Sequence, residues 1–274
     1  METGQRPQLR IFHPSDLAPH GAGAFHHALA IAWHERSRLT IMHVPGSDRV
    51  LREELPGVRA TLSTWGWTRP GNELEQLRTR GVTVRKVLSR GGDPVAACIR
   101  HLEAHPVDLV VLHTSQHGGR MRWQERSVSE EIRRGVALPT LFLPAGCKGW
   151  VDPMTGSRQP FRRVVVGIDR AEDDRALLDA LGRLPFDVAG PGVITRVHAG
   201  DRMETEPYVR QGVSLVEGPV VEALVHASRD ADLLVLGTRG PHGLFDALRG
   251  TTTEQVLRRS GCPLLALPLG DAGE

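Results

Sequence analysis

One series of short apolar segments occurs twice, in the same order, along this chain of 274 residues. The run Asp108–Leu112 is repeated as Asp232–Leu236, and the run Leu138–Leu143 is repeated within Gly261–Pro268. Longer segments with helical periodicity separate these runs, which is the pattern of βαβ units with a parallel sheet. The chain is therefore expected to fold into two α/β domains, each long enough to bury its own core.

The alternation also gives approximate element positions. In the first half, strands are expected near 8–13, 38–44, 82–88, 108–112 and 139–143, and helices near 21–36, 72–80, 94–104 and 127–134. A stretch rich in Gly and Pro then suggests a connection between domains. The expected division is a first domain at 1–145, a linker at 146–160 and a second domain at 161–274.

The spacing between equivalent residues shows where the halves differ. Asp16 and Asp169 are 153 residues apart, whereas Asp108 and Asp232 are only 124 apart. About 30 residues are therefore missing from the second half, between His198 and the following strand. The remaining stretch is close to the shortest that can connect parallel strands. The second domain is expected to lack about one helix and to leave one side of its sheet thinly covered.

The loop after the strand at 232–236 carries the strongest functional signal. Gly237-Thr-Arg-Gly240 is followed by nine residues and then by Gly250-Thr-Thr252. Glycines let a backbone turn and approach a ligand closely, and the free N–H groups at a helix start suit an anion. The spacing fits neither a P-loop nor a GxGxxG fingerprint. The alternative reading is a glycine-rich turn in which Thr251 caps the next helix.

This glycine spacing resembles the ATP-binding motif of the universal stress protein family, and the order of the surrounding segments resembles that family over nearly the whole chain. The resemblance implies a tandem protein of two flavodoxin-like (adenine nucleotide alpha hydrolase-like) domains, each with a five-stranded parallel sheet flanked by helices. It also implies an ATP site in the second domain, with a requirement for Mg left open. The implied nucleotide-binding residues are Gly167, Ile168, Asp169, Val197, Ala199, Gly237, Thr238, Arg239, Gly240, Gly250, Thr251 and Thr252.

By this resemblance, Asp169 would accept a hydrogen bond from the ribose or the adenine. The alternative is that Asp169 caps a helix beginning near Ala171. In the first half the same loop keeps its length, but His113, Gln116 and Arg126 replace the three glycines. Side chains at these positions would fill the volume of the phosphates, so one ATP per chain is expected.

The resemblance implies a nucleotide-dependent regulatory role in a stress response rather than catalysis. No positioned base or lysine accompanies the motif, although phosphoryl transfer usually requires one. The alternative is an enzyme, either a slow ATPase with at most weak hydrolysis or a nucleotidyl-transfer protein. A third possible function is a nucleotide-free scaffold on which partner proteins dock. No catalytic residue and no metal ligand is assigned, because the paired histidines are spaced as a solvated helix face.

Composition limits the partners and the compartment. The net charge is +2 and the arginines are interspersed with acids, which argues against a nucleic-acid surface. Three cysteines without a CxxC pair fit a reducing compartment. No apolar signal core or long apolar run occurs, so a cytoplasmic protein without a membrane segment is expected. An unknown protein partner is expected. The apolar last strands at 139–143 and 263–268 are expected to pair as an intrachain pseudo-dimer, and a homodimer is left open.

Overall fold

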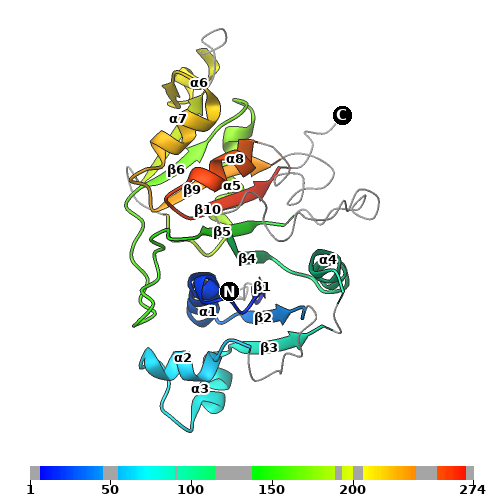
Figure 1. Ribbon diagram of the computed structural model, residues 1–274. Helices are drawn as coiled ribbons and strands as arrows, with labels where there is room; N and C mark the ends of the chain where they lie inside the picture. The colour runs from blue at the N-terminus through cyan, green and yellow to red at the C-terminus, as the bar shows by residue number, and fades with distance from the viewer. Residues whose placement is uncertain are drawn as a thin grey trace. The chain divides into compact units, whose positions relative to one another are not determined.

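A computed structural model describes residues 7–45, 55–89, 92–114, 138–188, 193–199, 206–238 and 252–269, and the elements are labelled in Figure 1. The chain forms two compact units, Met1–Val111 with Val151–Arg158, and Leu112–Trp150 with Gln159–Glu274. This division differs from the expected domains at 1–145 and 161–274. Two segments account for the difference: the last strand of the first repeat, and a hairpin in the expected linker.

The first unit is a parallel sheet with the strand order β3-β2-β1-β4. Its strands are β1 (Arg10–Pro14), β2 (Arg38–His43), β3 (Thr83–Leu88) and β4 (Leu109–Thr114), whose last three residues belong to the second unit. Its helices are the short η1 (Pro19–Gly21), α1 (Ala22–His34), α2 (Val58–Thr64), α3 (Glu73–Arg80) and α4 (Pro94–Ala104). The sequence predicted these strands and three of these helices, but not α2; the helix expected near 127–134 lies outside the described residues.

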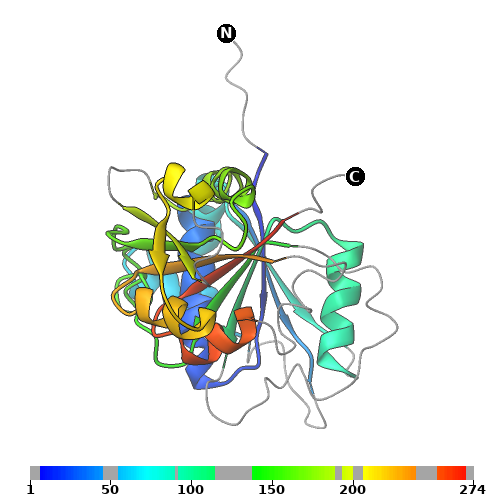
Figure 2. The same ribbon diagram turned by 90° about the horizontal axis from the view of Figure 1, so that it is seen from above.

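Alternating side chains of β1 place helices on both faces of this sheet. Phe12 stacks on His101 of α4, with ring centroids 5.3 Å apart. The next residue, His13, lies against Phe25 of α1 at 6.2 Å. Figure 2 shows α1 and α4 on opposite sides of the strands. The sheet is therefore the middle layer of a three-layer α/β unit.

The second unit has the strand order β5-β10-β9-β6-β7-β8. Its strands are β5 (Thr140–Pro144), β6 (Val164–Gly167), β7 (Ile194–Ala199), β8 (Ser214–Val216), β9 (Leu233–Thr238) and β10 (Leu264–Pro268). Its helices are α5 (Asp173–Gly182), α6 (Glu206–Arg210), α7 (Val220–Ala227) and α8 (Thr252–Arg259). One face of the sheet packs its buried Val, Leu and Ala side chains against Leu224 of α7 and Val256 of α8.

Strand β5 explains why the first unit ends before residue 145. It pairs antiparallel with β10, with Leu141 opposite Leu265 and Phe142 opposite Leu264. The last strands of the two repeats therefore pair, as their apolar sequences led us to expect. The pairing covers one edge of β5 and one edge of β10, whose paired side chains are buried. Without it, the backbone groups of both edges would be open to other chains.

The two repeats have the same internal order. The first shows its third, second, first and fourth strands side by side, and the second repeats this order as β8-β7-β6-β9 before β10. An aspartate holds the start of the first strand in each. Asp108 accepts from the backbone N–H of Arg10 at 2.8 Å, and Asp232 accepts from that of Arg163 at 3.0 Å. The expected α/β class with a mostly parallel sheet is confirmed.

The expected loss of a helix in the second repeat is also confirmed. Between β7 and β8 the described chain contains only α6, which has five residues, whereas the first repeat has α2 and α3 at this point. The edge strand β8 is correspondingly open. Val209 of α6 is 59% exposed and Leu215 of β8 is 40% exposed.

The segment expected to be a linker contains an ordered hairpin of the first unit. Val151 and Arg158 form an antiparallel bridge. Trp65 Nε1 donates to the carbonyl of Pro153 at 3.0 Å, and the N–H of Val151 donates to His27 Nε2 at 3.3 Å. The interpretation of all of 146–160 as a linker is therefore wrong for 151–158, because tertiary contacts with α1 and the indoles order a sequence that is locally rich in Gly and Pro.

Candidate functional site

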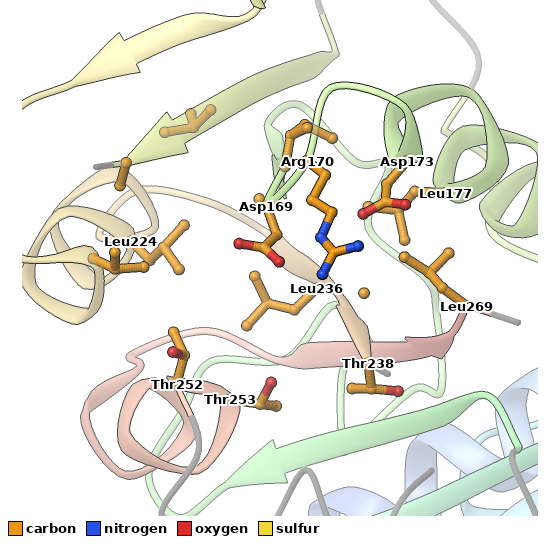
Figure 3. Close-up of a pocket in the computed structure, with 16 residues that line it drawn as sticks. Asp169, Arg170, Asp173, Leu177, Leu224, Leu236, Thr238, Thr252, Thr253 and Leu269 are labelled. Atoms are coloured by element: carbon orange, nitrogen blue, oxygen red, sulfur yellow. The ribbon is translucent and has the colours of Figure 1, made fainter. Parts of the chain in front are cut away.

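A cavity of about 400 Å³ lies in the second unit at the carboxyl ends of β6 and β9. These are the first and fourth strands of the repeat, and they are neighbours in the sheet. The strand order reverses between them, because β7 follows on the far side of β6 and β10 lies on the far side of β9. Open α/β sheets bind ligands at this reversal of strand order. Figure 3 shows the side chains that line the cavity.

Eight of the predicted nucleotide-binding residues line this cavity. They come from the end of β6 and the next loop, from β7, from the end of β9 and from the start of α8. These residues are Gly167, Ile168, Asp169, Val197, Ala199, Gly237, Thr238 and Thr252. The other four, Arg239, Gly240, Gly250 and Thr251, lie outside the described residues. The structure therefore brings together segments that are separated by more than 80 residues in the sequence.

The glycines that border the cavity are explained by packing. A Cβ on Gly237 would lie 2.6 Å from Leu269 Cδ1, and a Cβ on Gly167 would lie 2.6 Å from Leu236 Cδ2. Both distances are too short for a real contact. The backbone of neither residue is in the left-handed region. The sequence interpretation of Gly237 as a turning point is therefore wrong: Gly237 lies within β9, and its hydrogen makes room for a leucine that also lines the cavity.

Further lining residues were not predicted from the sequence. They are Arg170, Asp173, Leu177, Val220, Leu224, Leu236, Thr253 and Leu269. They lie in the first two turns of α5, α7 and α8, in the loop after β6, near the end of β9 and directly after β10. The repeated βα order could have placed these turns at the same edge of the sheet, although it does not tell which side chains point inward.

The polar groups of the cavity are concentrated on the loop after β6. In Figure 3 the carboxylate of Asp169 and the guanidinium of Arg170 both point into the cavity. Asp173, at the first turn of α5, is 7% exposed. Among the described lining residues, Arg170 is the only cation. A bound molecule would thus meet two carboxylates and one guanidinium on this side, and leucines and threonines on the others.

Asp169 does not cap the following helix. Helix α5 begins at Asp173, its N-cap is Glu172, and no side chain bonds to the cap. The equivalent Asp16 in the first repeat has a local role, since its Oδ1 accepts from the N–H of Ala18 at 3.0 Å. The helix-capping alternative for Asp169 is therefore excluded, and its carboxylate lies on the cavity wall.

The first repeat differs at the same edge. His113, the counterpart of Gly237, lies within β4 and is partly buried. Pro14 at the end of β1 takes the place of Gly167. Gln116 and Arg126 lie outside the described residues. At both strand ends where the second repeat has a glycine, the first repeat therefore has a larger side chain.

The model of the universal stress protein family matches residues 10–144 and 195–268, one segment in each repeat. The chain belongs to this family. The two segments make it a tandem universal stress protein. The second segment begins at β7, so β6 and Asp169 are placed in the site by the structure and not by the family match.

Solved structures support the fold of this universal stress protein. A universal stress protein from Archaeoglobus fulgidus DSM 4304 has a TM-score of 0.54 at 15% identity, covering 97% of this chain and 98% of its own. A functionally unknown protein from Pseudomonas aeruginosa PAO1 has a TM-score of 0.55 at 16% identity, covering 95% and 92%. A putative universal stress protein from Pseudomonas aeruginosa UCBPP-PA14 has a TM-score of 0.54 at 18% identity, with the same coverage. The comparison with curated proteins gave no match.

No helix in the described parts of the chain is long and apolar enough to cross a membrane.

Proposed function

We propose that this universal stress protein binds ATP in the cavity of its second repeat and uses the nucleotide as a regulatory signal in a stress response. The observation that carries the proposal is the convergence at one strand-order reversal of Asp169, the end of β9 and the start of α8. These are the segments that the sequence motif assigns to a nucleotide. A volume of about 400 Å³ is within the usual range for small-molecule sites.

The lining is suited to the two halves of a nucleotide. Val197, Val220 and Leu224 form an apolar wall against which an adenine ring would pack. Asp169 would accept a hydrogen bond from the ribose or the base. Thr252 begins α8, where free backbone N–H groups and the positive end of the helix dipole favour phosphate. Gly240, Gly250 and Thr251 would complete the phosphate contacts, and a magnesium ion could accompany the phosphates.

We assign the protein to the cytoplasm as part of the same proposal. Cys98, Cys147 and Cys262 are all free thiols. Burial raises the pKa of Cys98 and Cys147 to about 12, so both stay protonated and unreactive at neutral pH. This supports a reducing compartment, in which structural disulfides are rare.

Calorimetry with ATP tests the proposal, combined with mass spectrometry of any nucleotide released from the purified protein. We expect one site per chain. Asp169→Ala should weaken binding, and the matched variant Asp16→Ala in the first repeat should not. Absence of ATP binding at millimolar concentration, or equal effects of the two alanine variants, would reject the assignment. A turnover assay on the same samples separates a binding protein from a slow ATPase or nucleotidyl-transfer enzyme.

A further inference from the structure

An aromatic side chain attaches helix α6 to the loop that carries Asp169. Tyr208, the only tyrosine of the chain, donates from its hydroxyl to the backbone carbonyl of Asp169 at 2.8 Å. Its ring stacks on His198 at the end of β7, with centroids 3.8 Å apart and an interplanar angle of 17°. The short helix that replaces the lost crossover thus contacts the backbone of a residue in the proposed nucleotide site.

His198 extends this contact to the preceding residue. Its Nδ1 lies 2.8 Å from the carbonyl of Ile168, and because a carbonyl oxygen only accepts, Nδ1 carries the hydrogen. The first repeat has the same bond, from His43 Nδ1 to the carbonyl of Ser15 at 2.7 Å. The histidine is therefore part of the frame common to both repeats. Tyr208 belongs to the shortened crossover, which only the second repeat has.

We propose that Tyr208 is a positioning residue that holds Asp169 for the nucleotide and couples occupancy of the site to α6. This inference rests on the proposed ATP site. The Tyr208 bond fixes the peptide plane between Asp169 and Arg170, and both of these side chains point into the cavity. Loss of the bond would let the two polar groups of the wall reorient together.

The coupling acts in both directions. A helix of five residues is too short to be stable by itself, so α6 depends on its contacts with β8 and on Tyr208. A nucleotide that holds Asp169 in place stabilises the acceptor of the Tyr208 bond, and by linkage an ordered α6 favours the nucleotide. Val209, the next residue of α6, is 59% exposed, so ordering of α6 changes an apolar part of the protein surface.

Two variants at this position separate the hydrogen bond from the ring. Tyr208→Phe keeps the stacking on His198 and removes the hydroxyl, whereas Tyr208→Leu removes both. We expect the ATP dissociation constant to rise about 2- to 12-fold for Tyr208→Phe, the equivalent of one lost hydrogen bond, and further for Tyr208→Leu. Val209→Ser on the same helix is the control and should bind as the wild type does. The apo melting temperature of each variant is measured alongside.

Because Tyr208 is the only tyrosine, protein labelled with carbon-13 tyrosine reports on it without mutation. ATP should shift its single set of ring resonances. Wild-type protein that binds no ATP would overturn both the proposed function and this inference. Wild-type binding with an unshifted Tyr208 resonance and unchanged affinity in both tyrosine variants would overturn the coupling alone. A lower melting temperature with unchanged affinity would show a role in stability only and would also reject it.

Discussion

The two repeats of this universal stress protein share the bonds at the amino ends of their strands; at the carboxyl ends they share one histidine bond but differ in the residues that border the cavity of the second repeat. At the amino ends, Asp108 and Asp232 hold the first strands through equivalent backbone bonds. At the carboxyl ends, Pro14 and His113 in the first repeat correspond to Gly167 and Gly237 in the second. The amino ends carry bonds that assemble the sheet. The carboxyl end is where α/β sheets hold ligands, so the residues there can diverge without changing the fold.

The crossovers between the second and third strands show the same division of roles. In the first repeat, Trp33, Trp65 and Trp67 form a cluster in which the closest ring centroids are 4.7 Å apart, and the hairpin 151–158 covers it. In the second repeat, α6 is the one described helix between the corresponding strands β7 and β8. The repeat with the degenerate motif therefore carries a packed aromatic cluster at this crossover, whereas the repeat with the intact motif has a short helix.

The largest expected effect comes from copying the first repeat into the second. Gly250→Arg introduces the residue found at Arg126 and should abolish ATP binding. The loss of about three phosphate hydrogen bonds would weaken affinity by about 100-fold or more. Isothermal titration measures this, and an unchanged apo melting temperature shows that the fold is intact. The reverse change, Arg126→Gly, should not create a second site while His113 and Gln116 remain. Wild-type affinity in Gly250→Arg would mean that the glycine motif is only a turn.

The next effect is a dependence of stability on pH that belongs to the first repeat. Burial, opposed by the bond to Gly23, lowers the pKa of His27 from 6.5 to about 4. As the pH falls, His27 is protonated at a higher pH in the unfolded chain than in the folded protein. The contribution of neutral His27 to the free energy of unfolding is therefore fully present above pH 6.5 and is lost as the pH falls toward 4. This shift in the pKa of His27 corresponds to about 3 kcal/mol in the free energy of unfolding.

Urea unfolding of the wild type and of His27→Gln between pH 7 and 4 measures this contribution. Gln keeps an acceptor for the N–H of Val151 but does not titrate, so its stability should fall less over this range. The second repeat has Ala180 at the equivalent position and contributes no such slope. Parallel curves for the two proteins would contradict the assignment to His27.

A smaller effect is expected where the hairpin meets the tryptophans. Gly156 has a φ of +68°, and a Cβ there would overlap the indole of Trp65. Gly156→Ala should therefore destabilise the protein by about 2–3 kcal/mol, through backbone strain and overpacking together. Gly146 has a similar φ of +75° but open space around it, so Gly146→Ala should show only the backbone cost of about 1 kcal/mol. Equal losses of stability would mean that the hairpin does not pack on the indoles.

The smallest expected effect concerns Gly237. Leu269 must move to admit a methyl group at position 237. Gly237→Ala should therefore weaken the free energy of ATP binding by about 1 kcal/mol, which is a roughly fivefold loss of ATP affinity. The control is Gly182→Ala at the end of α5, where a Cβ meets nothing within 4 Å and affinity should not change. Unchanged ATP affinity in Gly237→Ala would show that Leu269 can move without reducing the room for the ligand.

The repeat made the sheet and much of the site predictable, because residues that follow equivalent strands must meet at the same edge. The spacing of the halves likewise revealed the lost helix. Contacts that depend on distant packing were not predictable. The segment 151–158 is rich in loop-forming residues, and its contacts with Trp65 and His27, which are distant in the sequence, help to give it a fixed structure. Tyr208 lies in a stretch without periodicity, and the reason for Gly237 becomes visible only with Leu269 beside it.

The antiparallel pairing of β5 with β10 has a consequence during synthesis. Phe142 and its partner Leu264 are 122 residues apart, so the ribosome completes the first repeat long before the matching strand emerges. Until then Leu141, Phe142 and Leu143 form an apolar strand with one uncovered edge, which nascent chains on neighbouring ribosomes could join. A chain that stalls before β10 would therefore be prone to aggregate, even with its first repeat already folded. Synthesis of β10 is the step that covers the open edge of β5.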